Sequence, residues 1–169
     1  MTSWGSSMKV NNDLSTTLYP FRERSRYHRS GLVFVDTISS PVLTDLIREL
    51  PADRIDWVRH VVDGLRSDQK WVSQTPESLL TELISLARGP GQYIGRVIFG
   101  LEITLSRWKQ VEIHRFWTKF LTLEKNASHA VLVVLEESAA FLGPESRDIE
   151  AFELGGRLLR FNSEIKDHN

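Results

Sequence analysis

The chain has 169 residues, of which 41% are apolar and 25% are charged, and its formal net charge is −1. This length and composition are typical of one folded domain with a sizeable core. The near-zero net charge provides no overall attraction to nucleic acid or to a membrane, so any such attraction must come from a local cluster of charge. There is no cysteine, which excludes disulfides, thiolate metal ligands and cysteine nucleophiles.

Residues 1–30 are predicted to form a disordered polar tail, because they contain too few apolar side chains to offset the entropy of ordering. The tail has five basic residues against two acidic ones. Four of the basic residues are arginines close together in its second half: Arg22, Arg24, Arg26 and Arg29. They are candidates for contact with phosphate groups or with an anionic membrane surface. The alternative is that the tail is a solvated linker.

Residues 31–169 are predicted to form a single globular domain that begins with a strand and three helices. Gly31–Asp36 is a short β-rich run. A first helix is predicted over Ser40–Leu50, where a capping serine precedes a proline and apolar residues then recur at helical spacing. A second apolar stripe of helical spacing covers Ile55–Leu65, and a third covers Thr75–Leu86.

The stretch Gln92–Trp108 is consistent with either a buried helix or a strand. Its glycines and β-branched residues disfavour a helix interior and favour a pleated surface. The sequence therefore predicts a strand. The apolar side chains that should point into one core are Val97, Phe99, Leu101, Ile103 and Leu105. Arg96, Glu102 and Thr104 should then face the other side.

The last part of the chain is predicted to add further strands. Residues 111–123 fit a helix or a strand, and their threonine and aromatic content favours a strand. Ala130–Glu137 is a compact apolar run that indicates a central strand. Two short runs around Gly155-Gly156 have the spacing of a β-hairpin. Because the helices precede the strands, the sequence predicts an α+β fold of three N-terminal helices followed by an antiparallel strand meander.

The sequence contains none of the short motifs for phosphate loops, dinucleotide binding, zinc proteolysis or a serine nucleophile. The chain is therefore expected not to be an enzyme and to need no cofactor. One constellation stands out: Asp56, His60 and Asp63 share a stripe of the second predicted helix, and such spacing can bring ligands onto one metal. The arginines nearby favour a solvated polar face instead. A small metal-assisted hydrolase is the alternative.

Charge is distributed unevenly along the second half of the chain. Residues 92–126 contain six basic residues against three acidic ones, with Trp108, Phe116, Trp117 and Phe120 among them. Residues 136–155 contain six acidic residues against one basic residue. Segments of opposite charge on two copies could meet head to tail. The residues predicted to make this contact are Arg107, Lys109, Arg115, Lys119, Glu145, Asp148, Glu150 and Glu153.

The middle of the chain, Leu79–Glu137, combines a Leu- and Ile-rich helix, a glycine-containing turn, the run IGRVIFGLEITLS and a segment with Trp and Phe. In this order of features it resembles the rhabdovirus matrix proteins, in particular the small ones of plant-infecting members. The resemblance implies a helical part that leads into a strand meander, self-association, and a place in the virion and the host cytoplasm or endomembrane. The family's budding motif is not carried over, because Tyr19-Pro20-Phe21-Arg22 departs from Y-P-x-L.

Two functions are therefore expected. The first is a non-enzymatic matrix-like structural protein that self-associates and bridges a viral nucleocapsid to an anionic membrane. Its partners would be further copies of itself, the viral nucleoprotein and the glycoprotein. The second is a soluble module that binds nucleic acid, RNA included, or a partner protein through the basic aromatic segment.

Overall fold

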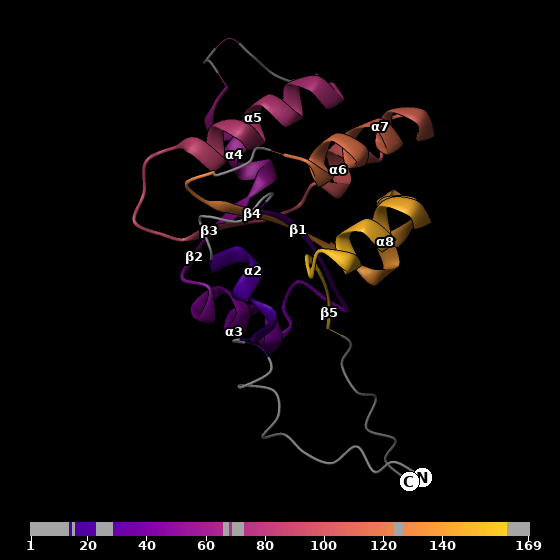
Figure 1. Ribbon diagram of the computed structural model, residues 1–169. Helices are drawn as coiled ribbons and strands as arrows, with labels where there is room; N and C mark the ends of the chain where they lie inside the picture. Colours follow the sequence, from indigo (N-terminus) through magenta and orange to yellow (C-terminus); the bar gives the residue numbers. More distant parts are fainter. Residues whose placement is uncertain are drawn as a thin grey trace, which may run out of the picture.

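The computed structural model describes residues 14, 16–22, 29–65, 68, 73–123 and 127–161. These residues form a parallel β-sheet between two layers of helices (Figure 1). The strands are β1 (Ser30–Val35), β2 (Ala52–Asp56), β3 (Gly95–Phe99), β4 (Ala130–Glu136) and β5 (Leu158–Phe161). The helices are α2 (Tyr19–Arg22), α3 (Pro41–Glu49), α4 (Trp57–Asp63), α5 (Pro76–Arg88), α6 (Glu102–Leu105), α7 (Gln110–Leu121), the 3-10 helix η1 (Glu137–Leu142) and α8 (Ser146–Leu154).

The strand order is β2-β3-β4-β1-β5, and every neighbouring pair is parallel. This is an α/β architecture, so the predicted α+β fold with an antiparallel strand meander is wrong. The physical reason lies in the strands themselves. Every residue of β1 and β3 is buried, because helices cover both faces of the sheet. Such strands are continuous apolar runs, whereas an antiparallel sheet with one wet face favours alternation.

The two faces of the sheet are covered unequally. The short α2 and α3 lie on one face, where their apolar side chains meet Val33 and Val35 of β1. Helices α4 to α8 cover the opposite face, which includes Leu32 and Phe34 of the same strand (Figure 1). The division follows from the path of the chain. It moves one way along the sheet from β1 to β2 and then back from β2 to β5, and right-handed crossovers place the two directions on opposite faces.

Several predicted elements are present as expected, namely β1, α3, α5 and the central strand β4. The second predicted helix is present only in its later part, because residues 52–56 form the edge strand β2. The predicted strand over 92–108 ends at Phe99, since Gly100 adopts a positive φ of 85° and turns the chain into α6.

The expected facing of the 92–108 side chains is therefore wrong beyond Phe99. Val97 and Phe99 pack on the α3 side, whereas Leu101 and Leu105 belong to the core on the other side of the sheet. Ile103 is 54% exposed. Arg96 was expected on the side opposite Val97 and Phe99, and it lies on that side, where its Nε donates to the backbone oxygen of Leu86 in α5 at 3.4 Å. It is buried there, with 3.0 Å between its Nη1 and a carboxylate oxygen of Asp53.

The predicted strand over 111–123 and the predicted hairpin are also wrong. Residues 110–121 form helix α7, whose apolar side chains recur at helical spacing and are buried: Ile113, Phe116, Trp117 and Phe120. The predicted hairpin is helix α8 followed by strand β5, which pairs in parallel with β1. Gly156, at φ 66°, ends α8, and two backbone hydrogen bonds close that end, from Arg157 to Phe152 and from Gly156 to Glu153. This is the Schellman arrangement of a helix terminus.

Part of the predicted N-terminal tail belongs to the folded core. Leu14, Leu18 and Phe21 are between 0% and 4% exposed and pack with α3 against the sheet. Arg29 is also buried, just before β1. The folded part of the chain therefore begins before residue 30, and residues 1–13 and 23–28 lie outside the described residues.

Candidate functional site

A groove of about 480 Å³ lies beyond the carboxyl ends of β2 and β3. Helix α4 forms one wall and α6, with the two residues that follow Ser106, forms the other. The residues that line it are Trp57, Val58, Val61, Val62, Leu65, Ser73, Gln74, Ile103, Thr104, Arg107 and Trp108. Most of these side chains are apolar or aromatic, as is usual for a binding cleft.

The floor of the groove is fixed by Gln74, which bonds to both walls. Its side-chain oxygen accepts hydrogen bonds from Trp57 Nε1 at 3.0 Å and from Thr104 Oγ1 at 3.1 Å. Its backbone oxygen accepts a third from Trp108 Nε1 at 2.8 Å. The polar groups of the floor therefore bond to one another, and the walls keep their spacing without a ligand.

The upper part of the groove is apolar and open. Val58 is 40% exposed, Val62 is 56% exposed and Ile103 is 54% exposed. All three are among the large apolar side chains of the described residues that the fold leaves in water. Their position on facing walls of one groove distinguishes them from apolar residues scattered singly, which need no explanation.

Gly100 determines where the second wall stands. It follows β3 directly, and its positive φ is one that glycine adopts without strain. A methyl group at this position would lie 3.7 Å from Asp56 Oδ1 and from a methyl carbon of Val58, so the turn runs against the start of α4. The turn at Gly100 leads from β3 directly into α6, which lines the groove opposite α4.

The central crevice of the sheet is occupied by the chain itself. The connections that leave β1 and β4 run over opposite faces of the sheet, and ligands of open α/β sheets bind in the crevice between such strand ends. Here the side chain of Glu136 spans this position and accepts a hydrogen bond from the backbone N–H of Ile38 at 3.1 Å. Beside it, Arg160 of β5 lies 3.6 Å from a carboxylate oxygen of Glu137.

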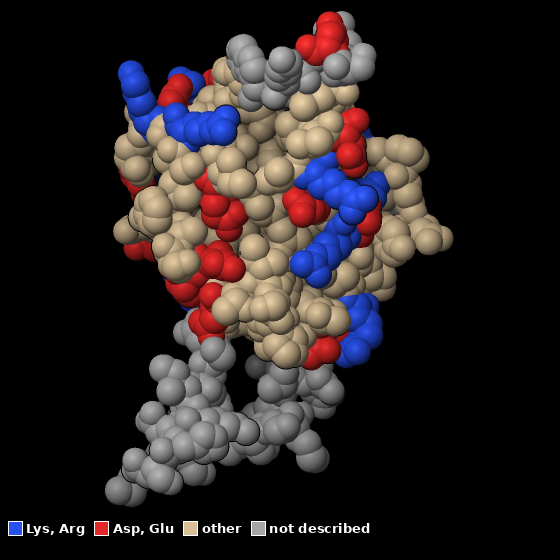
Figure 2. Space-filling view, turned by 180° about the vertical axis from the view of Figure 1, so that it is seen from behind, with Lys and Arg blue, Asp and Glu red and all other residues tan. Residues whose placement is uncertain are grey.

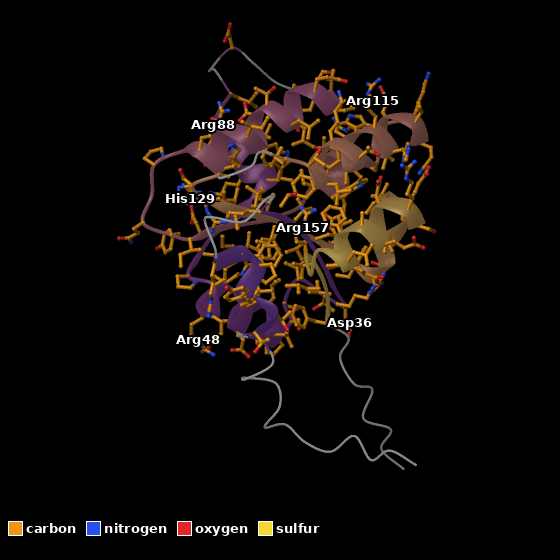
Figure 3. The ribbon with its side chains drawn as sticks, viewed as in Figure 1. Asp36, Arg48, Arg88, Arg115, His129 and Arg157 are labelled. Carbon is orange, nitrogen blue, oxygen red and sulfur yellow. The ribbon has the colours of Figure 1, made fainter. Side chains whose placement is uncertain are left out.

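The opposite end of the sheet is also filled by internal contacts. His129 lies there, at the far end of the sheet from Asp36 (Figure 3). Its two ring nitrogens are each 2.6 Å from a backbone oxygen, those of Tyr93 and Gly89. This contact ties the loop before β3 to the start of β4.

The four arginines predicted to contact phosphate or membrane have different surroundings. Arg29 is 2% exposed, and its guanidinium donates hydrogen bonds to the backbone oxygens of Phe21, Ala127 and Ser128. It is thus a buried structural residue and not a surface cation. Arg22 is half-buried and lies 4.0 Å from the carboxylate of Glu49. Arg24 and Arg26 lie outside the described residues.

The residues predicted for self-association lie on neighbouring helices. Helices α7 and α8 pack side by side, with the rings of Phe120 and Phe152 6.2 Å apart. Several of the predicted charges are used within the chain. Arg115 lies 3.1 Å from Glu77 of α5, and Glu145 lies 3.3 Å from Nδ1 of His114.

Asp148 is 5% exposed and accepts a hydrogen bond from Thr118 at 2.9 Å, so its carboxylate does not face solvent. Arg107, Lys109, Lys119, Glu150 and Glu153 are exposed. Figure 2 shows that acidic and basic groups also lie next to one another on the rear face, with uncharged surface between the charged areas.

The aromatic residues of the basic segment are mostly core residues. Phe116, Trp117 and Phe120 are fully buried, and Trp117 Nε1 donates to the backbone oxygen of Leu142 at 2.8 Å. Trp108 is half-buried and lines the groove. The predicted basic aromatic surface is therefore reduced to the neighbourhood of Arg107 and Trp108.

Asp56, His60 and Asp63 do not converge. The carboxylate of Asp56 caps α4 by accepting the N–H of Arg59 at 3.3 Å. His60 lies 3.7 Å from Glu82, and Asp63 lies 3.8 Å from Arg59. Within the described residues no group of three or more histidine and acidic side chains could hold a metal ion.

The sequence matches no family model and no curated protein. Among the described helices, none combines the length and the apolar character that crossing a membrane requires. The apolar lining of α4 had a signal in the sequence, because Val58, Val61, Val62 and Leu65 belong to the apolar stripe predicted over Ile55–Leu65. The role of Gln74 had no signal in the sequence, since a single glutamine before a helix predicts no particular contact.

Proposed function

We propose that the protein is a non-enzymatic module that binds a partner protein, and that the groove between α4 and α6 is the binding surface. The observation that carries the proposal is the joint exposure of Val58, Val62 and Ile103 on facing walls. Covering such side chains releases about 25 cal/mol per Å² of apolar surface removed from water. Since Gln74 already fixes the spacing of the walls, little ordering would oppose that gain.

The proposal does not depend on the resemblance to matrix proteins, whose implied meander is replaced here by a parallel sheet. The matrix function itself, with nucleoprotein, glycoprotein and membrane as partners, stays a prediction, and so does RNA binding. The proposal agrees with one part of the alternative function expected from the sequence, a soluble module that binds a partner protein. The residues of the basic aromatic segment that line the groove are Arg107 and Trp108.

The test uses an uncharged helical peptide of about five turns, with leucine in one stripe at i, i+3, i+4 and i+7 and alanine or glutamine elsewhere. Fluorescence anisotropy should detect binding to the wild-type protein. A double variant, Val62→Asp with Ile103→Asp, should bind at least about tenfold more weakly, because it would place carboxylates against an apolar stripe. Both side chains are exposed, so the fold should tolerate the changes.

Val111→Asp is the matched control, because Val111 is 66% exposed and does not line the groove. It should bind the peptide like the wild type. Equal binding by the double variant, or no binding by any of the three proteins, would refute the proposal.

A further inference from the structure

The exposed side chains of the groove are arranged as a helix-packing surface. Val58 and Val62 are four residues apart on α4 and form a ridge of the kind that packs into the groove of another helix. The walls are 40% to 56% exposed at these residues and at Ile103. A small molecule is normally enclosed on most of its surface. Walls this open fit a helix that brings its own apolar stripe and leaves its other side in water.

The charge of the lining is positive. Among the described side chains that line the groove, Arg107 is the charged one, and it is exposed. Its side chain makes no hydrogen bond or ion pair with any residue that the structure describes. This contrasts with Arg96, Arg115 and Arg160, each of which lies within 4.0 Å of a carboxylate. Lys109, two residues further along, is exposed as well.

The negative groups of the same elements are placed elsewhere. Asp63 lies 3.8 Å from Arg59 on the same helix and does not line the groove. Glu102 begins α6 and is half-buried, but it does not line the groove. Glu112 accepts the backbone N–H of Lys109 at 2.8 Å. Among the residues that the structure describes, no carboxylate pairs with Arg107, so it can pair with a group supplied from outside.

We infer that the occupant of the groove is an amphipathic helix of a partner protein that carries a carboxylate beside its apolar stripe, and that Arg107 receives this carboxylate. The inference rests on the proposed function and names the chemistry of its partner. An arginine beside an apolar wall suits this role, because its guanidinium forms two parallel hydrogen bonds with a carboxylate.

The experiment compares two peptides with the same leucine stripe. One has glutamate at the positions flanking the stripe, and the other has lysine there. The acidic peptide should bind the wild-type protein about three- to tenfold more tightly at low salt, and the difference should shrink as salt screens the charges. Arg107→Glu should reverse the preference. Arg147→Glu, a change of an exposed arginine on α8 outside the groove, should leave it unaltered.

The outcomes separate this inference from the proposed function. If both peptides bind equally and Arg107→Glu changes nothing, the inference is overturned while the groove remains a binding site. If neither peptide binds, the proposed function fails first. A single-stranded RNA oligonucleotide that displaces the acidic peptide in the wild type but not in Arg107→Glu would also overturn the inference, because it would show that Arg107 serves phosphates.

Discussion

At the residue scale, buried polar side chains join the parts of this chain that are far apart in sequence. The guanidinium of Arg29 bonds to carbonyl oxygens from before β1 and from before β4. Arg157 does the same with Ser30 and Leu121, and burial lowers its pKa below the ordinary value for arginine. An arginine has five N–H donors and no acceptor, so it can satisfy several carbonyl groups at strand ends at once. An arginine cluster in sequence is thus not by itself a surface feature.

Gly100 gives a prediction at this scale. Gly100→Ala should destabilise the protein by about 1–2 kcal/mol, because a side chain at φ 85° is strained. It should also weaken binding of the leucine peptide, since the turn positions α6. Gly64→Ala is the control: Gly64 has φ −83° at the end of α4, and alanine there should be neutral or slightly stabilising. Urea unfolding of both variants is the measurement, and equal midpoints would contradict this account.

At the element scale, the sequence predicts the elements whose local signals agree with their surroundings. Helices α3 and α5 begin at a serine or threonine followed by proline, and those starts are where they were expected. Helix α7 was missed because its aromatic and threonine residues favour strands in general. In the fold its four aromatic and aliphatic core residues are at helical spacing, and packing decides. The pairing partners of β1 could not be predicted, since nothing local specifies a neighbour from the far end of the chain.

The glycine pair at 155–156 shows how one local signal can serve two structures. A left-handed glycine fits the centre of a hairpin turn and the end of a helix equally well. Here it ends α8, and the chain then enters β5 in parallel with β1. For the groove, the apolar residues of α4, Trp108 and Arg107 could be singled out from the sequence. Gln74 could not, because its role depends on hydrogen bonds to residues of both walls that are distant in sequence.

The N-terminal segment gives a prediction at the element scale. Deleting residues 1–22 should lower the stability, because the segment contributes the fully buried Leu18 and Phe21 to the core with α3. Full burial of one such side chain is worth about 1.5–3 kcal/mol. Deleting residues 1–13 is the matched control, since it spares Leu14 and everything after it. Thermal unfolding followed by circular dichroism compares the two deletion variants with the full-length protein. If the longer deletion melted at the same temperature as the full-length protein, α2 would contribute little to stability.

At the scale of the whole molecule, the basic and the acidic segments lie next to each other in space. Helices α7 and α8 lie side by side, so an exposed lysine such as Lys119 and an exposed glutamate such as Glu150 belong to adjoining helices. Open head-to-tail assembly needs complementary surfaces that face different directions. Two adjoining surfaces of opposite charge can instead both be paired in a two-fold symmetric dimer. The basic surface of each copy then contacts the acidic surface of the other, and no surface is left for a third copy.

Any self-association through α7 and α8 should therefore stop at a dimer. Sedimentation should give a weight-average mass that approaches twice the monomer at high concentration and low salt and falls as salt rises. Each exposed ion pair is worth only about 0.2–1 kcal/mol, so Lys119→Glu or Glu150→Lys alone should reduce dimer formation. The two changes in one chain should restore it. A mass that rises steadily beyond the dimer would favour open-ended assembly, and a strict monomer would remove self-association altogether.

The place of β1 in the sheet has a consequence for folding during synthesis on the ribosome. β1 is an early part of the chain, yet both strands that flank it, β4 and β5, come from the last part. A ribosome releases the chain from its N-terminus, so the apolar run Leu32–Val35 emerges long before its neighbours exist. Because distant pairing is slow and unpaired apolar strands aggregate, the nascent chain should depend on chaperones until α8 and β5 have been made.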